Sequence, residues 1–293
     1  MRYGLVIAAV FVLLWSTGFL GGKLGLPYAE PMTFLALRFG IVAVVLAIWV
    51  VLTGRQWLRL HQVKDQIIIG ALVHFLYLGG VFAGLAQGVE AGVAAMIVGL
   101  QPIATALVAR QFLGERLVAV QWLGMALGLA GVALVIARKM EAGFGDPLGV
   151  LFCFLALLGI AFGSILQKSR SEHTPMQSGN VVQFLSGTAC CAAVALMFET
   201  MEVQWTGEFV FALGWLIIVL SFGAVALLYW MIQRGAASEV ASLFFLVPPC
   251  TAVFAWLLFD ESLEWLKIVG MVITAVGVLL VNRPSLLGQR AKN

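Results

Sequence analysis

The sequence predicts an all-α integral membrane protein with ten transmembrane helices in two inverted five-helix repeats. Three observations support this fold class: a very apolar composition, a regular series of long apolar runs, and an internal duplication. Of the 293 residues, 62% are hydrophobic and 11% are charged, whereas soluble domains carry roughly 25% charged residues. The mean hydropathy is +1.05. Because so few charges cannot cover a surface that faces water, we expect the solvent to be largely lipid.

The apolar runs define the predicted helices. A bilayer core about 30 Å thick is crossed by about 20 helical residues. The first run could be mistaken for a signal peptide, but it exceeds the usual ~7–15 apolar residues and lacks an A-x-A-like cleavage site. Ten predicted spans, with boundaries good to a few residues, cover residues 4–22, 31–53, 66–87, 91–113, 119–138, 147–168, 176–198, 209–233, 237–259 and 264–282.

The connections between the spans are short, and the longest ones carry the charge. These are GRQWLRLHQVKD (54–65), RKMEAGFGD (138–146), KSRSEHTP (168–175) and ETMEVQWTGE (199–208). No long polar stretch separates two cores. Residues 1–293 are therefore predicted to form a single membrane domain.

Basic residues in the connections predict the orientation, because cytoplasmic loops are enriched in Lys and Arg. With the N-terminus in the cytoplasm, twelve basic residues lie inside and four lie outside. The outside residues are Lys23, Arg138, Lys139 and Lys267. We therefore expect a multi-pass protein with both termini in the cytoplasm.

An internal repeat appears when the chain is shifted by 146 residues, which places the third to fifth spans on the eighth to tenth without a gap. The matched pairs include Gln87 and Gln233, Pro102 and Pro248, Glu115 and Glu261, Gly124 and Gly270, and Gly131 and Gly277. Repeat 1 covers about 1–138 and repeat 2 about 147–283. Since five helices are an odd number, the second repeat enters from the opposite side. Transporters with inverted repeats place their site at the repeat interface, near mid-membrane.

The matched prolines are predicted hinge or gating positions. Pro102 lies in the fourth span, and Pro248 and Pro249 lie in the ninth. Each proline removes a backbone donor and crowds the carbonyl four residues back, and such a carbonyl must face protein or a wet cavity. The alternative is a kink that only improves packing.

Polar and aromatic side chains within the spans are candidate substrate-binding residues, because polar groups in lipid face the bundle interior or a cavity. His74 and Tyr77 are three residues apart and share a helix face. His74 could also carry a proton, although a structural histidine and ordinary core packing are alternatives. The full candidate set is Ser16, His74, Tyr77, Gln101, Ser164, Tyr229, Trp230, Ser242 and Phe245.

Two charged residues lie inside predicted spans. Arg38 is about 10 Å into its helix at ~1.5 Å per residue, and we expect it to snorkel toward the outer face. It could tie helices together by bonding carbonyls, or hold an anionic group such as a substrate carboxylate. Glu239 lies about one turn inside the ninth span, near the N-terminus of the helix, where the helix dipole stabilises a carboxylate. A substrate or proton role for Glu239 is the alternative.

Several functions lack a sequence signal. There is no G-x-x-x-x-G-K-[ST] loop for ATP, and no Lys/Arg-rich run suggests nucleic acid. The four cysteines show neither zinc spacing nor a disulfide framework. HQVKD (61–65) is a lone acyltransferase-like match without a companion motif. We therefore predict no metal, no cofactor, no catalytic residue and no enzymatic activity.

A pattern of the form P-x12-E-x8-G-x6-G occurs in both repeats, at Pro102, Glu115, Gly124 and Gly131 and at Pro248, Glu261, Gly270 and Gly277. Together with LLWSTGFLGGKLGL and PMTFLALRFGIVAVVL near the N-terminus, it resembles the drug/metabolite transporter superfamily, in its ten-helix EamA-type branch. The resemblance implies two inverted five-helix repeats around a central cavity, and it supports Pro102, Pro248 and Arg38 as family positions. It does not make His74, Tyr77 or Glu239 substrate ligands, because substrate residues vary across the family. The WSTG stretch departs from the commoner W-G pair, which leaves Ser16 an open candidate.

The resemblance implies the export or exchange of small metabolites. We expect a bacterial-type inner-membrane secondary transporter that exports amino acids, including aromatic and apolar ones, by rocking about Pro102 and Pro248. Its expected partners are a small-molecule substrate and the lipid bilayer, while proton coupling and a monomeric or homodimeric state are both open. Multidrug or cationic efflux, for which Glu239 is the one candidate carboxylate, is an alternative. Nucleotide-sugar-like exchange is another, although the deep spans offer only Arg38 for a basic cavity.

Overall fold

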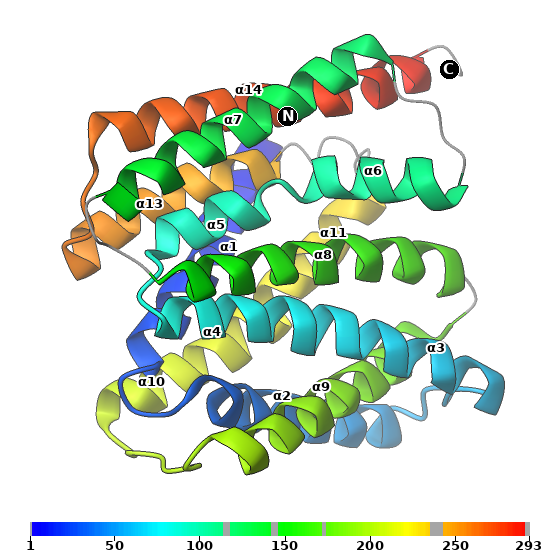
Figure 1. The fold of residues 1–293 in the computed structure, drawn as a ribbon. Coiled ribbons are helices and arrows are strands. Elements are labelled where there is room, and N and C mark those ends of the chain that lie inside the picture. The colour runs from blue at the N-terminus through cyan, green and yellow to red at the C-terminus, as the bar shows by residue number, and fades with distance from the viewer. Residues whose placement is uncertain (1, 114–117, 142–145, 172–173, 235–242, 291–293) are drawn as a thin grey trace.

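The computed structural model describes residues 2–113, 118–141, 146–171, 174–234 and 243–290, and these residues form a bundle of helices (Figure 1). The first half contains α1 (Arg2–Gly25), α2 (Pro31–Leu52), α3 (Leu60–Gly70), η1 (Ala71–Gly79), α4 (Gly80–Ala86), α5 (Ala91–Val98), α6 (Gln101–Leu113) and α7 (Ala119–Glu141). The second contains α8 (Pro147–Arg170), α9 (Met176–Phe198), α10 (Gly207–Trp215), η2 (Leu216–Ala224), α11 (Val225–Arg234), η3 (Phe244–Leu246), α13 (Val247–Phe259) and α14 (Trp265–Arg290).

The ten-helix membrane architecture predicted from the sequence is confirmed. Within the described residues, eight helices are long and apolar enough to cross a membrane. Two shorter apolar helices, Val247–Phe259 and Trp265–Val281, complete the set. Three predicted boundaries differ: the third span begins at Leu60 rather than 66, the fourth is interrupted between α5 and α6, and the last helix, α14, continues to Arg290 rather than 282. The earlier start follows from a cap, because Gln62 Oε1 accepts a hydrogen bond from Arg59 N at 3.0 Å.

Corresponding helices of the two halves run in opposite directions. In Figure 1, α1 and the α3–η1–α4 helix run from right to left, whereas α8 and the α10–η2–α11 helix run from left to right. The same reversal relates α7 to α14, which lie side by side. An inverted duplication produces this arrangement.

Glycines that match between the repeats hold α7 against α14. Gly124 lies against Gly277, and Gly131 lies against Gly270, so that a Cβ atom on any of them would overlap the opposite helix. Small residues allow the backbones of two membrane helices to approach closely. The repeated glycine pattern therefore builds the contact between the last helices of the two halves.

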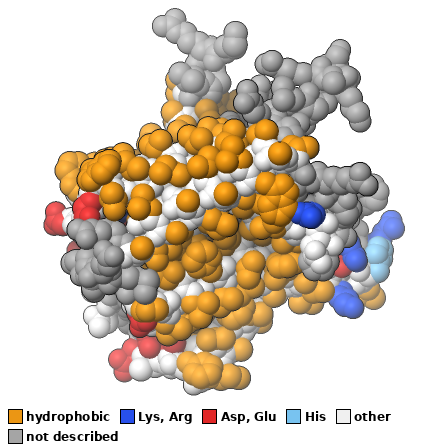
Figure 2. All heavy atoms as spheres, turned by 45° about the horizontal axis from the view of Figure 1, so that its top comes forward, with side chains coloured by type: hydrophobic (Ala, Val, Ile, Leu, Met, Phe, Trp, Pro, Cys, Tyr) orange, Lys and Arg blue, Asp and Glu red, His pale blue; other side chains and the backbone are white. Residues whose placement is uncertain are grey.

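The surface is apolar along the helices and charged at their ends (Figure 2). Large apolar residues such as Leu52, Phe198 and Leu258 are more than 60% exposed, which suits a lipid solvent. Acidic side chains gather at one end of the bundle, the acidic end, and basic side chains at the other, the basic end. The acidic residues lie between α9 and α10 or at the start of α10, and between α13 and α14: Glu199, Glu202, Glu208, Asp260 and Glu264. The basic residues lie between α2 and α3, in α3 and in the last turn of α8: Arg55, Arg59, Lys64, Lys168 and Arg170.

Candidate functional site

A cavity of about 210 Å³ lies between the two halves of the bundle. Its walls come from α1, α2, η1 and α4 of the first half and from α8, α9, η2 and α11 of the second. Most of the lining side chains are apolar or aromatic, and a few polar groups face the same space, as in small-molecule binding sites generally. The lining residues are Trp15, Gly18, Phe19, Arg38, Val73, His74, Tyr77, Leu78, Val81, Phe82, Ile160, Phe184, Leu220, Ser221 and Val225.

Two π-helical segments, one from each half, contribute to the walls of this cavity. η1 (Ala71–Gly79) and η2 (Leu216–Ala224) are equal in length, and each residue of η2 lies 145 positions after its counterpart in η1. π-Helical turns are rare and occur frequently at functional sites. η1 supplies His74 and Tyr77, and η2 supplies Ser221. The duplicated distortion therefore positions three of the polar groups of the cavity.

Arg38 reaches the cavity from α2. The residue is 7% exposed, and its Nη2 donates a hydrogen bond to Ser221 Oγ at 3.2 Å. Its guanidinium carbon lies 5.7 Å from the ring centre of Phe39, and its Nε has no hydrogen-bond partner among the described residues. The expected outward snorkelling is therefore not observed, because the side chain is buried and is bonded to Ser221 beside the cavity.

His74 is fixed by aromatic neighbours. Its ring stacks on Phe184, with the ring centres 4.1 Å apart and the planes at 20°, and lies 5.2 Å from Phe39. Gly187 makes room for this packing, because a Cβ atom there would meet His74 Cβ at 2.5 Å. His74 Nδ1 has no hydrogen-bond partner in the described part of the chain. Tyr77 lines the same cavity, so the two residues share a face as their spacing predicts.

An aromatic cluster separates the cavity from the acidic end. Phe82 lines the cavity and packs on Phe34, with ring centres 5.5 Å apart, and Phe34 packs in turn on Phe209 at 5.2 Å. Gly22 lies against the Phe82 ring, which a Cβ atom at this position would approach to 2.9 Å. The helices are therefore tightly packed on this side of the cavity.

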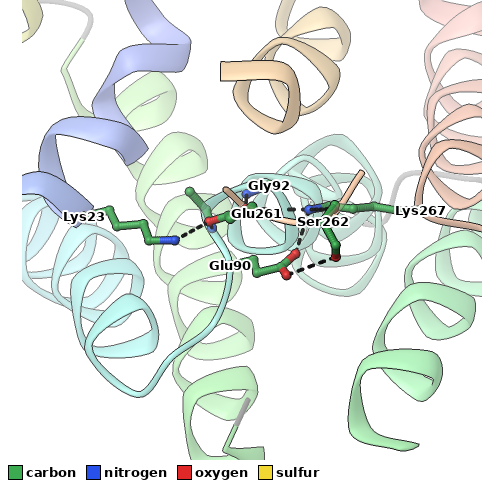
Figure 3. A network of polar contacts seen from close by, with 7 residues as sticks. Lys23, Glu90, Gly92, Glu261, Ser262 and Lys267 are labelled. Atoms are coloured by element: carbon green, nitrogen blue, oxygen red, sulfur yellow. Dashed lines mark hydrogen bonds and ion pairs between the residues drawn. The ribbon is translucent and has the colours of Figure 1, made fainter. Parts of the chain in front are cut away.

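An ion network joins the two halves beyond this cluster (Figure 3). Lys23 Nζ lies 2.7 Å from Glu261 Oε1, and Lys267 Nζ lies 2.7 Å from Glu90 Oε2. Lys267 also lies 3.6 Å from Glu261 Oε2. Each of the two short pairs connects a residue of the first half with a residue of the second.

The carboxylate of Glu261 is also bound to the start of α5. It accepts hydrogen bonds from Ala91 N at 2.8 Å and from Gly92 N at 3.5 Å. A carboxylate at a helix N-terminus accepts hydrogen bonds from backbone N–H groups that have no partner within the helix, and the helix dipole stabilises its negative charge. Glu261 and Lys267 are only 5% and 3% exposed. The network is therefore largely buried, and its sequence signal was the match of Glu261 with Glu115 in the repeat.

Three predicted site residues lie away from the cavity lining. Ser16 is buried, and its hydroxyl donates to the carbonyls of Val12 at 2.7 Å and Val247 at 3.3 Å. Gln101 Nε2 donates to Ser164 Oγ at 3.0 Å. These contacts tie α1 to α13 and α6 to α8.

The remaining candidates lie at or beyond the limit of the described residues. Trp230 is 37% exposed on α11 and is not among the lining residues. Glu239 and Ser242 lie outside the described residues, as do the side chains of Tyr229 and Phe245.

The matched prolines begin helices rather than bend them. Pro102 is the second residue of α6, and Pro248 is the second residue of α13, with Pro249 following it. A proline in the first turn of a helix costs no internal hydrogen bond. The two helix starts also lie close together, because a Cβ atom on Gly99 would lie 3.0 Å from Pro248 Cγ. The matched prolines therefore lie in the first turns of α6 and α13, and the interruption between α5 and α6 touches the start of α13.

The HQVKD stretch lies at the basic end, away from this cavity. His61 and Asp65 border a separate surface hollow of about 330 Å³, where Asp65 Oδ1 pairs with Arg170 Nη1 at 3.3 Å. Across the residues that the structure describes, no group of three or more His, Cys, Asp or Glu side chains could hold a metal ion.

Comparison with known proteins identifies the family. The model of the EamA-like transporter family matches residues 2–137 and again residues 147–283. The chain belongs to the EamA-like transporter family. Its two halves are the two copies of the family domain, and the cavity of this EamA-like transporter lies between them.

Similar proteins of this family cover nearly the whole chain. The uncharacterized transporter YvbV of Bacillus subtilis is 28% identical over 96% of this chain and 92% of its own length. The uncharacterized inner membrane transporter YedA of Escherichia coli K12 is 24% identical over 95% and 91%. A probable amino-acid metabolite efflux pump of Escherichia coli K12 is 25% identical over 94% and 93%. A crystal structure with 19% identity covers 98% of both chains with a TM-score of 0.66, which shows that the fold is shared.

Proposed function

We propose that this EamA-like transporter exports small amphipathic metabolites, with amino acids foremost, across a bacterial-type inner membrane. The single observation that carries the proposal is the 210 Å³ cavity between the two family domains, where Arg38, His74, Tyr77 and Ser221 face aromatic walls. Such a lining suits a solute with one polar end and an apolar body. The likeness to a probable amino-acid metabolite efflux pump supports the same substrate range.

The distribution of charge supports an orientation with the basic end in the cytoplasm. Arg55, Arg59 and Lys64 follow the end of α2. Glu199 instead binds the backbone at the start of α2, and Glu202 and Glu208 lie close to Glu199 in the chain. Positive residues favour the cytoplasmic side of short loops. In this orientation both termini are cytoplasmic, and the ion network of Figure 3 lies on the outer side of the cavity.

The proposed mechanism is alternating access. The network of Lys23, Glu90, Glu261 and Lys267 closes the outer side, and its separation opens the cavity outward. The two halves rock about Pro102 and Pro248, which lie at the starts of α6 and α13, and the contact of Gly99 with Pro248 joins these two places. Proton coupling, through His74 or Glu239, is a variant of this mechanism.

A transport panel in proteoliposomes tests the proposal. Purified protein is reconstituted without ATP and loaded with labelled amino acids of aromatic, aliphatic and polar type, with organic cations and a nucleotide sugar as comparison solutes. We expect efflux of apolar or aromatic amino acids above that of protein-free vesicles. Repeating the panel with and without a pH gradient measures coupling to protons. Transport of the cations or the nucleotide sugar alone, or of no solute, would contradict the proposal.

A further inference from the structure

We infer that Arg38 binds the carboxylate of the transported solute, and that the cavity prefers small organic carboxylates without an ammonium group over zwitterions of the same skeleton. The inference rests on the proposed function for the transport step, and it deepens that function by naming the substrate class. The main evidence for this inference is the balance of positive and negative charges in the cavity.

The first argument is that the Arg38 guanidinium carries a charge with few protein partners. A guanidinium has five N–H donors in a planar fork. The Nη2 of Arg38 donates to the neutral hydroxyl of Ser221, and its Nε has no partner among the described residues. A purely structural arginine would be expected to spend these donors on backbone carbonyls or a carboxylate, because unpaired buried donors are costly.

The second argument is that the described lining contains no Asp or Glu. A buried positive charge without a protein counterion favours an anionic ligand. Among small organic anions a carboxylate matches the guanidinium best, since it can accept two parallel N–H bonds. Arg38 is placed to offer them, because the side chain is buried and borders the cavity.

The third argument concerns the body of the ligand. Trp15, Phe19, Phe82 and Phe184 line the cavity together with aliphatic side chains. The volume of about 210 Å³ is smaller than the ~300–1,000 Å³ of pockets for drug-sized ligands. One carboxylate attached to an aryl or branched alkyl group fits this description.

The fourth argument concerns the ammonium group of an amino acid. Within the described lining, the side-chain acceptors available to it are the hydroxyls of Tyr77 and Ser221, both of them neutral partners. The ammonium would also lie within the same small cavity as the Arg38 guanidinium, and like charges repel strongly where water is scarce. The expected order of affinity is therefore monoanion, zwitterion, cation.

A series of four ligands with one phenylpropyl skeleton tests this order. The series consists of 3-phenylpropionate, 3-phenylpropanamide, phenylalanine and phenylalaninamide. Binding to the purified full-length transporter in detergent is measured by calorimetry and by the fluorescence of its tryptophans, one of which, Trp15, lines the cavity. We expect 3-phenylpropionate to bind at least about tenfold more tightly than its amide or phenylalanine, as loss of a hydrogen-bonded charge pair implies.

Variants at Arg38 assign the preference to this residue. In Arg38→Gln the ratio of acid to amide affinity is expected to fall to about one, and Arg38→Lys, which lacks the planar fork, is expected to lie between. Arg55→Gln at the exposed basic end is the matched control, and its ratio should equal that of the unmodified protein. The ligand series on the unmodified protein needs no variant, so poor folding of Arg38→Gln leaves the test intact.

The outcomes separate this inference from the proposed function. Equal affinity for acid and amide, no binding in the series, or an acid preference that survives in folded Arg38→Gln would overturn the assignment to Arg38. Tighter binding of phenylalanine than of 3-phenylpropionate would overturn the stated order. Transport of amino acids with either result leaves the export function standing. Arg38-dependent binding of the acid without transport of any solute would instead support the site and contradict the export function.

Discussion

Lys23 Nζ and Glu261 Oε1 lie 2.7 Å apart, and they belong to different copies of the family domain. Lys23 lies in the last turn of α1, and Glu261 lies in the connection between α13 and α14, where it also accepts a hydrogen bond from the start of α5. Three helical segments therefore meet at one carboxylate. Separating them requires this contact to break.

Removal of the Lys23 charge should favour opening of the outer side. A partly exposed pair contributes about 1 kcal/mol, so Lys23→Gln should raise the outward-open population roughly fivefold. The measurement is the rate at which Val225→Cys in the cavity wall reacts with a membrane-impermeant maleimide added outside cells, in a background lacking the four native cysteines. Lys168→Gln at the basic end is the control and should leave the rate unchanged. Slower labelling in Lys23→Gln would contradict the gating role.

Loss of Lys267 should destabilise the fold strongly. Its ammonium lies 2.7 Å from Glu90 and 3.6 Å from Glu261, and the residue is 3% exposed. Breaking a buried pair from one side costs about 3–5 kcal/mol, because a charge remains without its partner. Lys267→Met should show a loss of this size in the free energy of unfolding in mixed detergent.

The exposed pair of Asp65 and Arg170 provides the comparison for Lys267. Its side chains are 28% and 59% exposed, so Arg170→Gln should change the free energy of unfolding by about 0–1 kcal/mol. Combining Lys267→Met with Glu90→Gln should recover part of the first loss. Equal effects of Lys267→Met and Arg170→Gln would refute the buried character of the network.

The contact between α7 and α14 should not tolerate a methyl group at Gly131. A Cβ atom there would overlap the backbone carbonyl of Gly270. Overpacking typically costs about 1–3 kcal/mol, so Gly131→Ala should lower the free energy of unfolding by this amount. Gly214→Ala is the matched control in another helix, because nothing lies within 4 Å of its Cβ position. Alanine should stabilise that site by about 0.5–1 kcal/mol, and the same sign at both sites would contradict the close approach.

Acid should weaken the link between the start of α2 and the end of α9. Glu30 accepts hydrogen bonds at 2.6 Å from both the backbone N and the hydroxyl of Thr200, and the hydroxyl bond foremost lowers the pKa of Glu30 below its ordinary value of 4.5. A carboxyl with a lowered pKa in the fold stabilises it above the unfolded pKa. That contribution is lost as the pH falls from 4.5 through the lowered pKa.

Melting curves between pH 3 and pH 7 test the role of Glu30. The stability difference between the unmodified protein and Glu30→Gln should be largest at neutral pH and should shrink below about pH 4.5. Glu202→Gln, which removes an exposed carboxylate from the same region, is the control. A difference that grows as the pH falls would show that the sign is wrong.

The sequence predicted the architecture well because lipid imposes a simple rule. A span must be long, apolar and helical. The ten apolar runs of the sequence therefore correspond to the eight long and two shorter apolar helices among the described residues. The face shared by His74 and Tyr77 was also predictable, since residues three apart on a helix are neighbours even where the helix widens into a π turn.

Other features depend on contacts that no local pattern encodes. Ser16 is polar and deep, yet the carbonyl of Val12 one turn earlier satisfies its hydroxyl. Depth alone therefore does not place a polar residue in a cavity. The bond of Arg38 to Ser221 and the pairing of Lys267 with Glu90 each join distant parts of the chain.

Gly99 of the first half packs on Pro248 of the second half, so the two halves are in contact at this point. In the proposed rocking motion, Gly99 and Pro248 stay in contact, so that a displacement of α6 would also move α13. The inner and outer openings of the cavity would then move together. This contact would also prevent leakage of solute. A continuous aqueous path through the protein would require α6 and α13, which both carry a proline in their first turn, to separate.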